Sequence, residues 1–415
     1  MTPQFRRAGA LAFPLAIAAL AACSTPATTN TAPFNIAIVG DMPYGKSPTD
    51  TRQLEAHPRL LSALNDSPEV ALIAHVGDTH SGKQYCTERY NRTIQTLWHA
   101  VRKPLVYTPG DNEWMDCHKA KEGGGSYNKA TGQIDYIVGS DGQPVDYAKG
   151  HPLANLDLVR ALFFATPGQT LGAPMAVHSQ GLEHHPAHPA DKAFVENVWW
   201  EQSGVLFVTV NIPGGSNNGT DPWYAAPEMS TEQKDEVAVR TAATLRWLDT
   251  AFSRASSAGD VAMVILTQAD LWDVDEAPSG LAHVSGYRPY VDKLAEGART
   301  YGLPVLLVVG DSHSYRSDNP LRPGAPCVLE VEPASAAVAC SDPRAHALLS
   351  ARKSPDDAYA VHPMKQPVNN FHRIVVHGET LPMEWLQLRV DPTANAPHGL
   401  DAFGPFSWKR VRPAL

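Results

Sequence analysis

The chain has 415 residues, of which 43% are apolar and 19% charged, and its formal net charge is −9. These proportions are typical of a globular protein with a sizeable core. The negative charge argues against binding of nucleic-acid backbones or anionic membrane surfaces by charge alone.

The first residues are typical of an export signal. Arg6 and Arg7 precede an apolar run from Ala8 to Ala22, which leads into the sequence LAAC ending at Cys23. This stretch resembles a bacterial lipoprotein signal, which implies removal of residues 1–22 and a lipid on Cys23. An ordinary cleaved secretory signal is the alternative. A spanning helix is disfavoured, because the run is shorter than the roughly 20 residues that a span needs.

Ser24 follows the cysteine and resembles the sorting signal for the outer membrane. We therefore expect a protein of the bacterial cell envelope that is held by its lipid in the outer rather than the inner membrane and faces the periplasm. After the cysteine, residues 24–33 contain only Ser, Thr, Pro, Ala and Asn, and residues 23–33 are predicted to form a flexible tether.

Four further cysteines remain, an even number for an oxidising compartment: Cys86, Cys117, Cys327 and Cys340. Disulfides are therefore expected. Proximity in the sequence favours a bond between Cys327 and Cys340, which leaves Cys86 with Cys117. None of the four belongs to a CxxC pair, so a zinc-thiolate site has little support.

Short apolar runs rich in β-branched residues alternate with helix-like stretches from residue 34 onward. Strands are predicted at 34–40, 70–77, 104–110, 205–212, 261–268 and 305–310, and helices at 51–66, 87–102 and 230–255. Ser230 and Gln233 have the spacing of a capping box at the start of the last helix. The alternation predicts an α/β protein whose chemistry lies at the carboxyl ends of the strands.

Residues 34–415 are predicted to form one domain with two surface insertions, near 119–150 and 172–192, where the chain is polar and rich in Gly or Pro. Residues 326–392 are predicted to add antiparallel strands that flank the same sheets.

Four predicted strands end in the same way, with a glycine followed by an acidic residue. These ends are Gly40-Asp41, Gly77-Asp78, Gly110-Asp111 and Gly310-Asp311, and His313 follows the last of them. A glycine permits a sharp turn, after which the carboxylate or imidazole points into the crevice above the sheet. Several hard oxygen ligands with a histidine suit one or two divalent cations.

This series resembles the calcineurin-like metallophosphoesterases, over most of residues 34–320, and more closely a bacterial lipoprotein subgroup with the motif GDNEW, here residues 110–114. The resemblance implies a four-layer αββα sandwich of two mixed sheets with a dinuclear metal site at the strand ends. Several family positions are changed here: Asp111 stands in place of a ligand asparagine, and Gln268 in place of a histidine at a strand end. Pro43 stands where the family has a metal-binding histidine, and Asp311 replaces the first histidine of the last motif.

Carried over residue by residue, the resemblance implies two ligand sets. Asp41, Asp78 and His313 would hold one cation, and Asp78, Asp111, Gln268 and Asp311 the other. The second set is all oxygen, which favours Mn²⁺, Mg²⁺ or Ca²⁺ over Zn²⁺. It also crowds three carboxylates, so a site with one cation, or none, is an open alternative.

The resemblance further implies hydrolysis of a phosphomonoester or phosphodiester by a metal-bound hydroxide. Asn112 takes the place of the histidine that helps the leaving group, and His80 or His313 would have to supply the proton. His80 either faces the crevice or lies in a solvated loop.

Substrate contacts are predicted for Glu113 and for Asn217 and Asn218 in the sequence PGGSNNG; cap or turn roles are the alternatives.

Two functions remain open. The chain is either a metal-dependent phosphoesterase acting on a small phosphoester or a lipid headgroup, or a protein of the same fold that has lost turnover and serves as a binding or scaffold lipoprotein.

Overall fold

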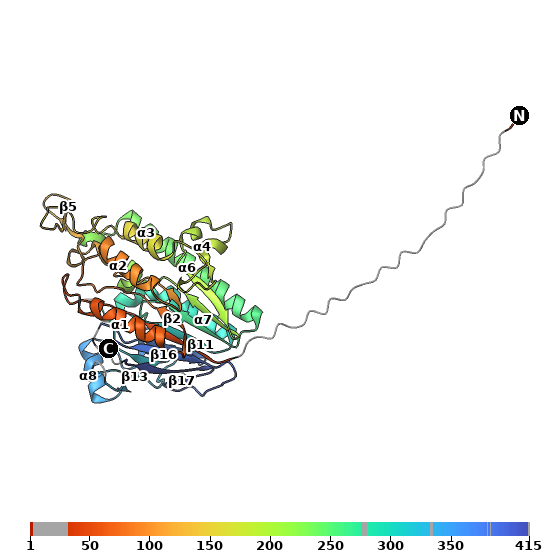
Figure 1. Ribbon diagram of the computed structural model, residues 1–415. Helices are drawn as coiled ribbons and strands as arrows, with labels where there is room; N and C mark the ends of the chain where they lie inside the picture. The colour runs from red at the N-terminus through yellow and green to blue at the C-terminus, as the bar shows by residue number, and fades with distance from the viewer. Residues whose placement is uncertain (3–31, 275–279, 333–334, 380, 382, 414–415) are drawn as a thin grey trace.

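A computed structural model describes residues 1–2, 32–274, 280–332, 335–379, 381 and 383–413 (Figure 1). Cys23, nearly all of the predicted signal peptide and most of the predicted tether lie outside the described residues. None of the helices in the described ranges combines the length and the apolar character needed to cross a bilayer.

Two large mixed sheets form the centre of the molecule. Within the described residues, the first sheet has seven strands, in the order β17-β18-β16-β1-β2-β3-β6. Its strands are β1 (Phe34–Val39), β2 (Val70–His75), β3 (Pro104–Tyr107), β6 (Leu171–Gly172), β16 (Trp385–Val390), β17 (Ala402–Phe403) and β18 (Phe406–Val411).

The second sheet has nine strands in the described residues, in the order β14-β13-β12-β15-β11-β10-β9-β8-β7. They are β7 (His178–Ser179), β8 (Val198–Gln202), β9 (Val205–Thr209), β10 (Ala262–Leu266), β11 (Val305–Val309), β12 (Arg316–Asp318), β13 (Val328–Leu329), β14 (Val338–Ala339) and β15 (Phe371–Val375). All six strands predicted between residues 34 and 310 are present.

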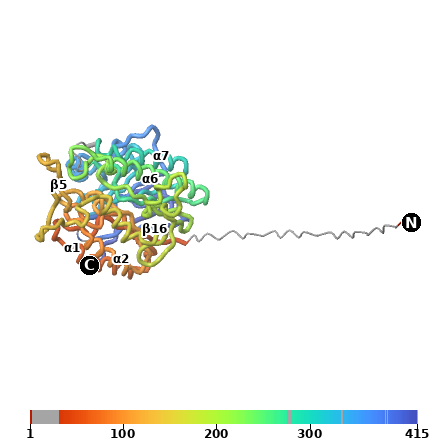
Figure 2. Tube along the Cα trace, turned by 90° about the horizontal axis from the view of Figure 1, so that it is seen from above, coloured from red at the N-terminus to blue at the C-terminus, as the bar shows by residue number. Residues whose placement is uncertain are grey.

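Helices cover the outer face of each sheet. The first sheet packs against α1 (Arg52–Asp66), α2 (Glu88–His99) and α3 (Pro152–Phe163), and the second against α6 (Thr231–Ala258) and α7 (Arg288–Tyr301). Figure 2 shows α1 and α2 on one side of the molecule and α6 and α7 on the opposite side. Shorter helices are α4 (Gln180–Glu183), α5 (Gly214–Asn218) and α8 (Pro343–Ala351).

Successive side chains of β1 point alternately to the two faces of the first sheet, and this pattern determines which core each of them joins. Ile36 and Ile38 lie in the core between the two sheets, where they join Val264 of the second sheet. Ala37 and Val39 point to the other face, into the core beneath α1. The predicted four-layer αββα sandwich with two mixed sheets is confirmed.

The predicted capping box of α6 is half confirmed. The Ser230 hydroxyl oxygen accepts a hydrogen bond from the Gln233 N–H at 3.1 Å. The Gln233 side chain does not return to Ser230; its oxygen instead accepts from Trp223 N, and its amide group donates to the backbone carbonyl of Asp221. Gln233 therefore connects α6 to the loop before it.

One prediction about the later strands is wrong. β15 was predicted to be antiparallel, but it pairs in parallel with β11, with Phe371 opposite Val305, and is antiparallel only to β12. All five of its residues are buried, as expected of a strand inside a sheet. The predicted insertion at 119–150 contains a hairpin of β4 (Gly125–Asn128) and β5 (Gln133–Tyr136).

Candidate functional site

The carboxyl ends of strands from both sheets meet at one place. Asp41, Asp78 and Asp111 follow β1, β2 and β3, and Asp311 follows β11. Backbone hydrogen bonds connect these ends, because Asp41 N donates to Gly77 O at 3.0 Å and Asp311 N donates to Asp41 Oδ1 at 3.0 Å. The structure thus brings together the four aspartates that the sequence singles out.

Several residues at this place have an uncommon backbone conformation. Asp41, Asp78, Asp311 and His313 have φ values of 54°, 58°, 72° and 61°. Such left-handed conformations cost free energy in residues other than glycine, and they cluster at functional sites. Three of these residues, Asp78, Asp311 and His313, line the cavity, and Asp41 is buried beneath it.

Asp41, Asp78 and His313 form the most compact group of potential ligands. Their ligand atoms all lie within 4.8 Å of one another, and His313 Nε2 is 3.7 Å from Asp41 Oδ1. Asp41 Oδ2 is buried without a hydrogen-bond partner. Two carboxylates and an imidazole are a suitable donor set for a divalent cation, so these residues fit the ion that the sequence predicts.

Burial dominates the electrostatics of the aspartates. It raises the pKa of Asp41 to about 6 and the pKa of Asp111 to about 7, and it raises those of Asp78 and Asp311 well above the ordinary value. The carboxylates also repel one another. A cation would offset both effects.

Glu379 belongs to this site, although the sequence analysis missed it. Its Oε2 lies 3.1 Å from His313 Nδ1, and its backbone N–H donates to Asp41 O at 2.9 Å. Interaction with His313 lowers the pKa of Glu379 to about 2. Gly378-Glu379 repeats the pattern of a glycine and an acidic residue after a strand, here β15, and that signal would have found it.

Gln268, which the sequence predicts to be a metal ligand, has both ends of its side-chain amide in hydrogen bonds. Its oxygen accepts from Gly214 N at 2.9 Å, while its amide nitrogen donates to Asp111 Oδ1 at 3.0 Å and to Asp78 Oδ2 at 3.3 Å. The oxygen that would bind a cation is therefore turned away from the carboxylates.

The three residues predicted to help the leaving group lie in different surroundings. The Asn112 amide donates to Asp78 Oδ2 at 2.9 Å and to the Tyr44 hydroxyl at 3.1 Å, so its donors are engaged. His80 is fully buried and has neither of the two predicted positions, the crevice or a solvated loop. His313 lines the cavity beside Glu379.

Glu113, predicted to contact substrate, is instead a buried support. Its carboxylate accepts from Thr79 N at 2.9 Å, from Gly110 N at 3.0 Å and from the Tyr107 hydroxyl at 2.8 Å. It therefore holds the ends of β2 and β3 together beneath the crevice.

Asn217 and Asn218, also predicted to contact substrate, point into the protein. The Asn217 amide nitrogen donates to Thr241 at 3.0 Å and its Oδ1 accepts from the buried Arg240, and Asn218 donates to Glu236 at 2.9 Å. Neither side chain is part of the cavity wall; Gly215 of the same turn is.

A cavity of about 680 Å³ opens above the strand ends. Asp78, Asp111 and Asp311 contribute to its floor, and Lys83 and Lys121 to its wall. The side chains of these lysines are 61% and 57% exposed, so their ammonium groups are accessible from solvent. The cavity therefore combines an acidic floor with a mixed rim, in which these lysines lie near carboxylates such as Glu379 and Glu122.

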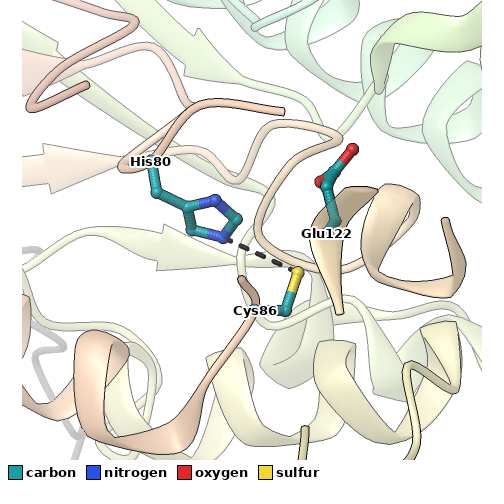
Figure 3. Close-up of side chains that lie close together, drawn as sticks. All are labelled: His80, Cys86 and Glu122. Atoms are coloured by element: carbon teal, nitrogen blue, oxygen red, sulfur yellow. Dashed lines mark hydrogen bonds between the residues drawn. The ribbon is translucent and has the colours of Figure 1, made fainter. Parts of the chain in front are cut away.

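Both predicted disulfides are present, Cys86–Cys117 and Cys327–Cys340. Figure 3 shows His80, Cys86 and Glu122 close together, with His80 Nε2 at 3.8 Å from Cys86 Sγ. Because the Cys86 sulfur is bonded to Cys117, it offers no thiolate, and this cluster is a poorer candidate for a cation than the aspartate site.

Comparison with known proteins gives a weak structural likeness. No family model matches the chain, and no curated protein sequence matches it. One similar solved structure is a purple acid phosphatase isolated from yellow lupin (Lupinus luteus) seeds, with a TM-score of 0.38 and 12% sequence identity. The match covers 92% of this chain and 52% of the phosphatase, so the chain spans about half the length of that protein.

Proposed function

We propose that the chain binds a divalent cation and hydrolyses a phosphomonoester or phosphodiester. The observation that carries this proposal is the compact group of Asp41, Asp78 and His313, which lies where the strand ends meet beneath the cavity. A divalent cation at these residues would lower the pKa of a bound water and neutralise charge on phosphoryl oxygens.

The exposed lysines of the cavity rim support an anionic substrate. Lys83 and Lys121 attract and orient an ester whose phosphoryl group would otherwise be repelled by the acidic floor. Arg352 also lines the cavity and donates to the backbone oxygen of Ser312 at 3.3 Å, which holds its guanidinium beside Ser312. This charge pattern fits a small phosphoester or a lipid headgroup.

A second candidate function is binding without turnover, as a scaffold or recognition protein. It is favoured by the positions of Asn112 and His80, because the donors of Asn112 are engaged with Asp78 and Tyr44 and His80 is buried. Of the three residues predicted to help the leaving group, Asn112 lines the cavity with its donors already used, and His80 is not part of the cavity wall.

Metal analysis and turnover together distinguish the two functions. The chain without residues 1–23 is assayed with p-nitrophenyl phosphate and bis-p-nitrophenyl phosphate in the presence of Mn²⁺, Mg²⁺ or Ca²⁺. We expect turnover that is lost in Asp78→Ala and kept in Asp66→Ala, a surface control on α1 whose side chain is 66% exposed. Bound metal without turnover supports the binding protein, and absence of both contradicts the phosphoesterase.

We also propose that a lipid on Cys23 holds the protein at the bacterial envelope, with the outer membrane favoured and the folded part in the periplasm. The LAAC sequence supports this. Radiolabelled palmitate should be incorporated into the expressed chain and not into Cys23→Ser. Label in both forms, or in neither, would contradict the anchor.

A further inference from the structure

The hydrogen bonds around Asp78 bear on how many cations the site holds. We infer that the site binds a single divalent cation, at Asp41, Asp78 and His313, and that the Gln268 side-chain amide takes the place of a second one. This inference rests on the metal-binding part of the proposed function and does not depend on turnover.

Asp78 Oδ2 is saturated with hydrogen-bond donors. It accepts from the Tyr44 hydroxyl at 2.7 Å, from Asn112 Nδ2 at 2.9 Å and from Gln268 Nε2 at 3.3 Å. A carboxylate oxygen has about two lone pairs, so three donors leave no position for a cation. A second cation shared by Asp78 and Asp111 would have to displace these donors.

The orientation of the Gln268 amide follows from its partners. Its oxygen accepts from the backbone N–H of Gly214, and its nitrogen donates to both Asp78 and Asp111. Rotation of the amide by 180° would set its oxygen against two carboxylates and its N–H against the Gly214 N–H. All three hydrogen bonds would be lost, so this orientation is the stable one.

Close packing also restricts the Gln268 side chain. Gly77 has no Cβ, and a Cβ built there would lie 2.6 Å from Gln268 Cβ. Gln268 itself is fully buried. Movement of its amide away from the carboxylates would therefore disturb the ends of β2 and β10.

The other side of Asp78 remains open to a cation. Asp78 Oδ1 accepts one hydrogen bond, from Asn112 N at 3.2 Å, and keeps a lone pair. Asp41 contributes Oδ2, which is buried and has no hydrogen-bond partner, and His313 contributes an imidazole. Neutral hydrogen-bond donors thus satisfy Asp78 Oδ2, and a cation would neutralise the negative charge on the side of Asp78 Oδ1 and Asp41.

Metal content tests the inference directly. The purified chain is loaded with Mn²⁺, dialysed, and measured by inductively coupled plasma mass spectrometry and electron paramagnetic resonance. We expect one Mn²⁺ per chain, with the six-line spectrum of an isolated ion. Two equivalents with an exchange-coupled spectrum would overturn the inference. No bound metal would overturn both the inference and the proposed function, whereas one bound ion without turnover would contradict the phosphoesterase alone.

The role of Gln268 is tested by Gln268→Glu, which replaces its N–H donors with a second carboxylate oxygen. We expect this variant to bind two Mn²⁺ per chain, because a second cation relieves the repulsion from Asp78 and Asp111. Gln180→Glu is the matched control, since Gln180 is also buried and donates to the backbone oxygen of Ala243 and to Asp191 Oδ2, which is not one of the strand-end aspartates. The Gln180→Glu variant should bind one Mn²⁺ per chain. A folded Gln268→Glu that also binds one would contradict the role assigned to Gln268.

Discussion

Glu379 Oε2 lies 3.1 Å from His313 Nδ1, while the other ring nitrogen of His313 is 3.7 Å from Asp41 Oδ1. The carboxylate therefore orients the imidazole so that Nε2 faces the proposed cation. Such a partner behind a histidine ligand fixes its tautomer and increases its basicity.

Replacement of Glu379 by leucine should weaken divalent-cation binding about 10- to 100-fold, because His313 loses its orientation. Isothermal titration calorimetry with Mn²⁺ measures the loss. Glu379→Gln should retain most of the affinity, since an amide oxygen still accepts from Nδ1–H.

Lys83 provides the control for this prediction, because its ammonium lies 3.5 Å from Glu379 Oε1 on the exposed side. Lys83→Met removes that ion pair and leaves His313 in place, so the affinity should be nearly unchanged. An equal loss in Lys83→Met and Glu379→Leu would show that surface charge, and not orientation of His313, explains the effect.

Gly310 leaves room for the Asp41 carboxylate. A Cβ at Gly310 would lie 2.6 Å from Asp41 Oδ2, and this carboxylate has little freedom to move because Oδ1 accepts from Asp311 N. Gly310→Ala should therefore cost about 1 to 3 kcal/mol of stability and reduce Mn²⁺ affinity.

Gly399→Ala is the control for Gly310→Ala, because a Cβ there has its nearest contact at 3.3 Å. Urea unfolding and calorimetric titration compare the two. Wild-type stability and affinity in Gly310→Ala would mean that the Asp41 carboxylate is less constrained than its surroundings indicate.

The sequence predicted the strand-end aspartates because strand periodicity and Gly-Asp turns are local signals. It missed Glu379 because β15 was expected to be antiparallel, which would put Gly378 at the wrong edge of the sheet. The orientation of the Gln268 side-chain amide depends on its hydrogen bonds with Gly214, Asp78 and Asp111, which are far away in the chain. No local pattern specifies which way a buried amide turns; three-dimensional packing decides it.

The Cys86–Cys117 disulfide joins the loop after Asp78 to the loop after Asp111. Its sulfur atoms lie 3.3 Å and 3.5 Å from the backbone oxygen of Asn112. The double variant Cys86→Ser/Cys117→Ser should lose about 3 to 4 kcal/mol of unfolding free energy. It should also bind Mn²⁺ more weakly, because both loops carry residues of the site.

The second disulfide, Cys327–Cys340, separates these two effects. Its cysteines are 13 residues apart, against 31 for Cys86 and Cys117, and they lie in a separate small core with Leu329 and Leu349. Cys327→Ser/Cys340→Ser should lower stability and leave Mn²⁺ affinity unchanged. Loss of affinity in both double variants would indicate a general loosening of the fold.

The stabilisation that Mn²⁺ provides should increase as the pH rises from 5 to 8. Burial raises the pKa of Asp41 to about 6 in the metal-free protein. The folded chain then holds a proton that the unfolded chain releases near pH 4. This contribution to stability is complete below pH 4 and is lost as the pH rises through 6. A bound cation takes the place of the proton, so the metal-bound form escapes this loss.

Buried histidines change stability in the opposite direction. Burial lowers the pKa of His57 to about 3 and that of His75 to about 4, so their contribution is lost as the pH falls below about 6.5. Both lie outside the proposed ligand group, so they act equally with and without metal and cancel in the difference. Thermal denaturation with Mn²⁺ or with a chelator measures that difference at each pH. A difference in Tm that stays constant or shrinks between pH 5 and 8 would show that protons and the cation do not compete for Asp41.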